Sequence, residues 1–197
     1  MGERPRCNWS GSDPLYVEHH DVEWGVPVAD PRALWEHLVL DGFQAGLAWI
    51  VVLRKREGLR EAFFRFDPAV VARMTREDIE RLLVDARVIR SRAKIEAAVA
   101  NARAYLEMQE AGEGFDRFAW SFVGGRPVQN NWRSAQEVPA QTALSADIAK
   151  ALKAKGFKFV GPVSVYAWMQ AVGLVNDHIT CCFRHDEVEQ LGRIHRL

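Results

Sequence analysis

The sequence predicts an all-α protein. Helix-start signals recur along its 197 residues, glycines fall where helices are expected to end, and no alternating run is long enough for a confident β-strand. Hydrophobic residues make up 48% of the chain, enough for a sizeable core in one domain, or in two small lobes that share a core. We expect that domain to span residues 1–183, with 184–197 as a charged C-terminal tail that is open to fraying.

The first long helix is expected to begin at Asp30-Pro31, because Asp caps a helix and Pro suits its first turn. Apolar residues then recur at helical spacing as far as Leu53, with Gly42 and Gly46 as candidate breaks.

Asp67-Pro68 repeats this start signal for a short helix over 69–74. Thr75 opens the next helix with a capping box in which Asp78 replaces the usual Glu or Gln. A long helix after Ser91 carries one continuous apolar stripe: Ile95, Val99, Ala102 and Leu106.

Two segments follow, an aromatic helix and an irregular polar loop: 115–123 and 128–142. Ser145 is expected to cap a helix over 146–155, with Gly156 as its left-handed C-cap. Gly161-Pro162 starts another helix over 163–172.

Composition excludes several classes of protein. The 26 basic and 26 acidic residues give zero formal net charge, so binding to nucleic acid requires a local patch. The longest apolar run, Ala45–Leu53, is far shorter than the roughly 20 residues that cross a bilayer, and no leader indicates export. Three cysteines, two of them adjacent, form no closed disulfide set, so we expect a cytoplasmic location. Nothing implies an obligate protein partner.

Four residues from the two ends of the chain are candidate metal ligands: Cys7, His20, His178 and Cys182. On a helix, His178 and Cys182 share one face because they are four residues apart. Two Cys and two His close a tetrahedral zinc site with no open position, which is typical of a structural metal. Cys181 and His19 are alternative ligands, and a buried free cysteine beside unrelated histidines is the competing interpretation.

A glycine-bounded turn joins two predicted helices and is flanked by lysines. Such a helix–hairpin–helix turn directs backbone N–H groups, a helix N-terminus and lysines at one point, which suits a DNA phosphate. The candidate DNA contacts are Lys155, Gly156, Lys158 and Gly161. Lysines in the last turn of a glycine-capped helix are also explained by the helix dipole alone.

Four residues are candidate contacts for a nucleobase: Tyr16, His19, Asp41 and Trp49. Aromatic rings stack on a base, and a carboxylate accepts hydrogen bonds from its edge. The competing interpretation places Trp49 in the core of an apolar helix and makes Asp41, before Gly42, a simple cap.

Six segments carry a resemblance to a known family: Cys7–Trp9, Asp13–Tyr16, His20–Pro27, Gln44–Trp49, Gly156–Gly161 and Gly173–His178. Together they resemble DNA-3-methyladenine glycosylase I, from about Cys7 to Cys182. The resemblance implies the all-α fold of the helix–hairpin–helix DNA glycosylase superfamily, with one structural zinc joining the N- and C-terminal segments. It implies Cys7, His20, His178 and Cys182 as ligands, with Cys181 one place before the family's ligand.

The resemblance also implies a base-excision-repair enzyme that flips an alkylated base out of double-stranded DNA and hydrolyses its N-glycosidic bond, leaving an abasic site. The expected base is 3-methyladenine, whose positive charge favours stacking on Trp49 and Tyr16. Asp41 is the expected catalytic residue, accepting hydrogen bonds from the adenine edge. No lysine is nominated for strand cleavage, and no general base is assigned. Asp177, beside a zinc ligand, is expected to support that ligand or to cap a helix.

Two residues depart from the family's pattern. Asp41 stands where the family usually has Glu. Because Asp is one methylene shorter, its carboxylate is withdrawn by roughly 1.5 Å, enough to lose a direct hydrogen bond. His19 stands where a second Tyr is common, and it either offsets that loss or takes part in a pocket for a different damaged base. A third hypothesis is a zinc-stabilised DNA-binding module that breaks no bond.

Overall fold

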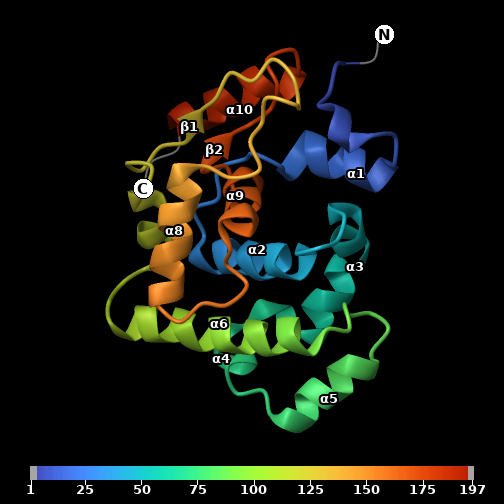
Figure 1. The fold of residues 1–197 in the computed structure, drawn as a ribbon, viewed down its shortest axis with the longest axis vertical. Coiled ribbons are helices and arrows are strands. Elements are labelled where there is room, and N and C mark those ends of the chain that lie inside the picture. The colour runs from blue at the N-terminus through green and yellow to red at the C-terminus, as the bar shows by residue number, and fades with distance from the viewer. Residues whose placement is uncertain (1–3, 195–197) are drawn as a thin grey trace.

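A computed structural model describes residues 4–194, and these form the mostly helical fold that the sequence predicts (Figure 1). The helices are α1 (Pro14–Glu18), α2 (Pro31–Gln44), α3 (Trp49–Ala62), α4 (Pro68–Val71), α5 (Arg76–Val84), α6 (Arg92–Glu110), α7 (Phe115–Ser121), α8 (Ala143–Ala154), α9 (Pro162–Ala171) and α10 (Phe183–Ile194). Three short turns, η1 (Asn8–Ser10), η2 (His19–Glu23) and η3 (Phe64–Phe66), and two strands, β1 (Val128–Gln129) and β2 (Val175–Asn176), complete the described elements. None of the helices in residues 4–194 is long and apolar enough to span a membrane.

The long helix expected after Asp30 is divided in two at one of the two predicted glycines. Gly46 adopts a φ of +77° and lies in the turn between α2 and α3, whereas Gly42 is buried within α2. A positive φ is costly for residues with a side chain, so Gly46 makes this sharp turn possible. The turn lets α2 and α3 present Asp41 and Trp49 to the same cavity.

Helix caps are partly as predicted. The capping box at the start of α5 is present, with Thr75 and Asp78 each bonding the other's backbone. The cap of α8 is one turn earlier than predicted, because Thr142 is the N-cap and Ser145 is its N3 partner. Ser145 therefore bonds back to Thr142 instead of starting the helix.

The segment expected to be an irregular loop contains a short strand. Val128 and Gln129 pair in parallel with Val175 and Asn176. Two residues are too few to leave an alternating pattern in the sequence, which is why no strand was expected. The pairing fastens the start of the 130–140 loop beside the segment that leads to His178.

Phe183–Ile194 form α10, in place of the frayed end suggested by the charge of the predicted tail; residues 195–197 of that tail lie outside the described residues. Val188 is 1% exposed, and His185 Nε2 lies 3.1 Å from the backbone carbonyl of Asn130 and 3.0 Å from Nε2 of Gln129. The helix is thus packed on one face and charged on the other. The division of the chain into one domain or two lobes stays a prediction.

The core is formed where α2 meets α6, α7 and α9 (Figure 1). In this view α6 runs below α2, α9 stands above α2, and α8 stands to the left of α9 and packs against it. Trp168 Nε1 donates to the carbonyl of Leu34 at 2.9 Å and so connects α9 to α2. The largest fully buried side chains are Trp35, Trp120, Trp168 and Tyr166. Because burial of one large apolar side chain stabilises by about 1.5–3 kcal/mol, α2 and α9 are firm supports for the site.

Candidate active site and metal centre

A cavity of about 400 Å³ lies between the N-terminal segment, α2, α3 and α9. Its walls include Trp9, Tyr16, Trp24 and Trp49, and the ring of Trp9 lies 5.1 Å from Tyr16 and 4.9 Å from Trp24 between centroids. The 130–140 loop contributes Ala135, Val138, Pro139 and Ala140. Trp49 is largely buried, yet it borders this cavity, so the interpretation of Trp49 as core alone is wrong.

Three buried polar atoms of cavity-lining residues have no hydrogen-bond partner within the described residues: Asp41 Oδ2, His19 Nε2 and Trp49 Nε1. Asp41 is 3% exposed, and burial raises the pKa of its carboxyl well above the usual value. An unpaired buried polar group costs about 1–3 kcal/mol. The walls therefore suit a flat ligand that stacks on aromatic rings and supplies the missing hydrogen bonds.

His19 is oriented by a hydrogen bond to Glu23, which is itself ion-paired with Arg56. Its Nδ1 lies 2.8 Å from Glu23 Oε2, and Arg56 Nη2 donates to Glu23 Oε1 at 2.9 Å. Burial alone raises the pKa of Glu23, but the hydrogen bonds from His19 and Arg56 outweigh it and hold that pKa below its ordinary value. Glu23 therefore stays ionised. Because Glu23 binds Nδ1 of His19, the ring nitrogen without a hydrogen-bond partner in the described residues is Nε2.

A π-helical turn places two adjacent histidines in two different sites. In η2 the N–H of Trp24 donates to the carbonyl of His19, five residues earlier, at 2.9 Å. His19 lines the cavity, whereas His20 belongs to a group of metal-ligating side chains. Such turns are rare and occur often at functional sites.

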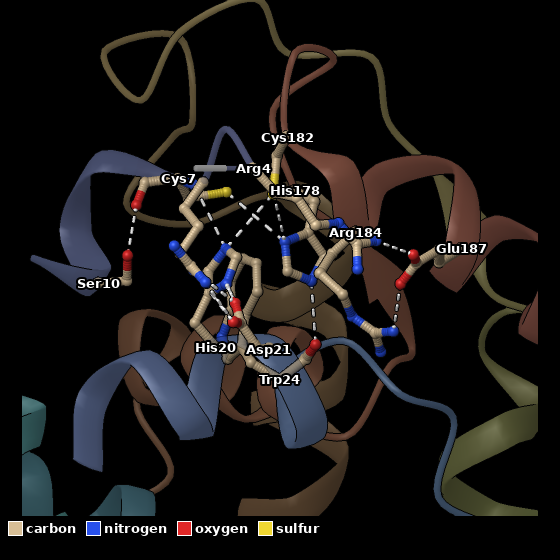
Figure 2. A network of polar contacts seen from close by, with 11 residues as sticks. Arg4, Cys7, Ser10, His20, Asp21, Trp24, His178, Cys182, Arg184 and Glu187 are labelled. Carbon is tan, nitrogen blue, oxygen red and sulfur yellow. Dashed lines mark hydrogen bonds and ion pairs between the residues drawn. The ribbon is translucent and has the colours of Figure 1, made fainter. Parts of the chain in front are cut away.

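That group consists of the four predicted ligands, all buried: Cys7, His20, His178 and Cys182. Their donor atoms lie within 4.8 Å of one another. Figure 2 shows the first two on the N-terminal segment, facing the other two on the C-terminal segment. The described residues thus contain a Cys₂His₂ cluster that joins the two ends of the chain and is consistent with a structural metal.

The distances in the cluster match a tetrahedral ion. Cys182 Sγ lies 3.4 Å from His20 Nε2 and 3.5 Å from His178 Nδ1, and Cys7 Sγ lies 3.5 Å from His178 Nδ1. Zinc bonds of about 2.1 Å to nitrogen and about 2.3 Å to sulfur, at tetrahedral angles, place the two atoms about 3.5 Å apart. The two cysteines and two histidines therefore surround a space of the right size for such an ion.

Each histidine of the cluster is oriented by a second hydrogen bond. His20 Nδ1 lies 2.7 Å from Asp21 Oδ1, and His178 Nε2 lies 3.0 Å from the carbonyl of Trp24 (Figure 2). These contacts place a proton on the outer nitrogen, so the inner nitrogen keeps a lone pair for a metal.

Two expectations about this region are wrong. His178 and Cys182 do not lie on a helix: they flank a turn in which the N–H of Cys182 donates to the carbonyl of Ile179 at 2.8 Å. The alternative ligands are also excluded from the cluster, because Cys181 is exposed and His19 faces Glu23.

Asp177 is the other carboxylate of the cavity wall, and it is saturated with hydrogen bonds. Four side chains donate to it: Asn130, Trp132, Tyr166 and Gln170, at 2.6–2.8 Å. None of these partners is a metal ligand, and none is a helix N-terminus. The expectation that Asp177 supports a ligand or caps a helix is therefore wrong.

The predicted hairpin connects α8 to α9. Gly156 has a φ of +91°, as a left-handed C-cap requires, and Gly161 is the N-cap of α9. Lys158 is exposed and its N–H donates to Asn101 Oδ1 at 2.7 Å, which fixes the turn to α6. Lys155 is paired with Glu113, so its ammonium is already used within the protein.

Several cavity residues were not identified from the sequence. Trp9 and Trp24 lie inside the conspicuous segments Cys7–Trp9 and His20–Pro27, but no spacing indicates that their rings meet. Tyr166 and Gln170 lie one turn apart on α9, a pattern that also fits an ordinary helix face.

Comparisons with known proteins agree with this geometry. A sequence model of the family described as methyladenine glycosylase matches residues 9–185. The chain is 52% identical over 180 residues to DNA-3-methyladenine glycosylase 1 of Escherichia coli strain K12, covering 90% of this chain and 96% of that protein. It is 48% identical over 177 residues to a DNA-3-methyladenine glycosylase of Haemophilus influenzae, with the same coverage.

Solved structures give the same result. A crystal structure of a 3-methyladenine DNA glycosylase I has a TM-score of 0.90 and 53% identity, covering 91% of this chain and 98% of that one. The Staphylococcus aureus enzyme, studied for its recognition of 3-methyladenine, has a TM-score of 0.88 and 37% identity, covering 92% and 97%. With a matching family model over most of its length and relatives at about half identity, this chain belongs to the methyladenine glycosylase family.

Proposed function

We propose that the protein is a monofunctional DNA glycosylase that removes 3-methyladenine from double-stranded DNA and leaves an abasic site. Family membership supports the reaction. The single observation that carries the residue assignment is the unpartnered, buried carboxylate of Asp41 in an aromatic-walled cavity. The cavity volume of about 400 Å³ lies at the lower end of the range for small-molecule sites, roughly 300–1,000 Å³, as one flipped base requires.

The aromatic walls recognise the charge of the damaged base. A 3-methylated adenine nucleotide is cationic, and a cation over an aromatic face gains about 0.5–2 kcal/mol. Trp49 and Tyr16 supply those faces, with Trp9 packed against Tyr16. Unmodified adenine is neutral and gains less from the same rings, so the walls favour the methylated base.

Asp41 supplies the opposite charge and a hydrogen-bond acceptor. Burial in the cavity disfavours its ionised form, and a cationic base beside it restores that form because the two charges attract. The carboxylate then accepts a hydrogen bond from the adenine edge and fixes the orientation of the base. Asp41 is in this sense the catalytic residue, since it touches the leaving group.

Hydrolysis of the glycosidic bond needs few other groups from the protein. The C1′–N9 bond breaks and its electron pair goes to the positively charged base, which leaves neutral; water then adds to the sugar carbon and releases a proton to the solvent. Asp177 has no role as a base, because its oxygens accept four hydrogen bonds. No lysine is among the described residues that line the cavity, which agrees with hydrolysis without strand cleavage.

His19 compensates for the short side chain of Asp41. Both line the cavity, and each has one unpartnered polar atom. The imidazole held by Glu23 offers a second polar contact to the base, where the family commonly has Tyr. The same two departures favour one alternative, a glycosylase that accepts a different damaged base.

The metal that fits the Cys₂His₂ cluster is zinc, bound by Cys7, His20, His178 and Cys182. Four protein ligands fill a tetrahedral zinc and leave no position for water, so the ion supplies stability and no reaction step. Cys7 also lines the base cavity, and Trp24 lies against His178 with centroids 4.6 Å apart. The ion thereby fixes two walls of the cavity.

DNA binds across the hairpin and the mouth of the cavity. The exposed Lys158 and the backbone of Gly161 are the proposed phosphate contacts, because the N–H of Gly156 already donates to the carbonyl of Lys153 at 3.0 Å. Leu47 is 39% exposed in the turn between α2 and α3, close in sequence to the cavity residues Gln44 and Trp49. An exposed apolar side chain at this place is suited to fill the space that the flipped base leaves in the DNA duplex.

The three free cysteines fit a reducing cytoplasm.

The direct test is to incubate the protein with methylated duplex DNA and to measure the free bases released against a heat control. We expect 3-methyladenine in excess of the control, with intact strands until alkali is added. Release of another base would favour the alternative specificity. DNA binding without any release would support the non-catalytic module instead.

A further inference from the structure

Asp177 joins two walls of the base cavity that are distant in sequence. Its Oδ1 accepts from Asn130 Nδ2 at 2.6 Å and from Trp132 Nε1 at 2.8 Å, both in the loop after β1. Its Oδ2 accepts from Tyr166 Oη at 2.6 Å and from Gln170 Nε2 at 2.7 Å, both on α9. One buried carboxylate thus binds the loop with one oxygen and the helix with the other.

These four bonds occupy both carboxylate oxygens of Asp177. An ionised carboxylate offers about four lone-pair sites, and here each has a donor. Asp177 is 2% exposed, and none of its four partners is cationic. A carboxyl group buried in this way is costly unless its hydrogen bonds persist, so the four donors are held firmly in place.

The loop that Asp177 holds is itself part of the cavity. Its residues Ala135, Val138, Pro139 and Ala140 form one wall, and they are small or only partly buried. Val138 also packs against the main core, and the other supports within the described residues lie near the start of the loop. The N–H of Thr180 donates to the carbonyl of Trp132 at 2.8 Å, and the short β1–β2 pair holds the start of the loop.

We propose that Asp177 is a positioning residue for base recognition. It fixes the 130–140 loop against α9, so that the cavity keeps the width of one flat base and excludes water. This inference rests on the proposed function, in which the cavity receives the flipped base. Asp177 itself makes no bond to the base, because its oxygens are already occupied.

The test releases the loop without altering any residue that lines the cavity. Trp132→Phe keeps an aromatic ring but removes the N–H donor, and Asn130→Ala removes the amide donor. Asn130→Asp places a second carboxylate beside Asp177 and so repels it. Full-length, metal-loaded protein is used throughout. The readouts are the Kd for free 3-methyladenine by calorimetry, the KM and kcat on methylated DNA, and the Tm.

We expect the Kd for the free base and the KM to rise together, by at least about fivefold in the Trp132→Phe/Asn130→Ala double variant, which is the order expected from losing one to two hydrogen bonds to a charged acceptor. Asn130→Asp should have a larger effect than Asn130→Ala. The change in kcat should be smaller, since Asp41 and the rings remain. Trp120→Phe is the matched control: it removes an indole hydrogen bond to the carbonyl of Val28, neither residue lines the cavity, and it should lower Tm with an unchanged Kd.

The outcomes are distinct. If the variants lose Tm as the control does but bind 3-methyladenine as the parent does, Asp177 is only structural and the inference is overturned. If the parent binds no 3-methyladenine, the proposed function fails first. A Kd that rises in the loop variants alone supports the positioning role.

Discussion

Replacing Asp41 by Asn should reduce activity and raise stability at the same time. The amide keeps the size of the side chain but loses its charge and one acceptor. A hydrogen bond to a charged group contributes about 1.5–3 kcal/mol, so base excision should fall about 10- to 150-fold at tenfold per 1.4 kcal/mol. The Asp41→Glu variant keeps a carboxylate, on a side chain that reaches one methylene farther than Asp, so it should retain most of the activity of the parent.

The stability change follows from the raised pKa of Asp41. Between its unfolded value, about 3.9, and its higher folded value, the native state binds more protons than the unfolded state, so stability falls as pH rises through this range. Asn carries no such penalty. The Tm of Asp41→Asn should therefore exceed that of the parent near neutral pH, and the difference should vanish below about pH 3.9.

The assay pairs initial rates of 3-methyladenine release under kcat/KM conditions with thermal melts from pH 3 to pH 8, for the parent and both variants. Two results would refute the reasoning. Equal excision by the parent and Asp41→Asn would remove Asp41 from recognition, and a lower Tm for Asp41→Asn at neutral pH would show that the carboxylate has a stabilising partner.

Three further predictions concern the metal and the DNA. Elemental analysis should find about one zinc per chain, lost in Cys182→Ser and kept in Cys181→Ser; the reverse pattern would overturn the ligand assignment. Lys158→Ala should weaken binding to undamaged duplex and reduce the slope of the logarithm of the binding constant against the logarithm of the salt concentration by about 0.9. Lys155→Ala should change neither, because Lys155 is paired with Glu113. Equal effects of the two variants in fluorescence-anisotropy titrations would show that Lys158 is not the preferred phosphate contact. Leu47→Ala should lower kcat/KM on duplex but leave the calorimetric Kd for the free base unchanged, and a weaker Kd would place Leu47 in the cavity wall instead.

Local signals in the sequence predict much of the fold. The turn at Gly46, the capping box at Thr75 and the left-handed Gly156 depend on neighbours within a few residues, so their patterns are readable without the fold. The cap of α8 illustrates the limit of such patterns. Thr142 and Ser145 are both good capping residues three positions apart, and only the backbone shows which of them begins the helix.

Long-range features were harder to predict. The four members of the Cys₂His₂ cluster could be predicted because Cys and His are rare and lie in segments that resemble a known family, even though the helix expected at His178 is a turn. The four hydrogen bonds to Asp177 had no such signal in the sequence. Its four donors come from Asn130, Trp132 and α9, and only the folded chain brings those segments together.

The most direct measurement for this account is the crystal structure of the protein with free 3-methyladenine bound. We predict the base between Trp49 and Tyr16, with its amino group within hydrogen-bond distance of the Asp41 carboxylate. A base bound at another surface, or seated in the cavity with Asp41 turned away and unbonded, would contradict the account.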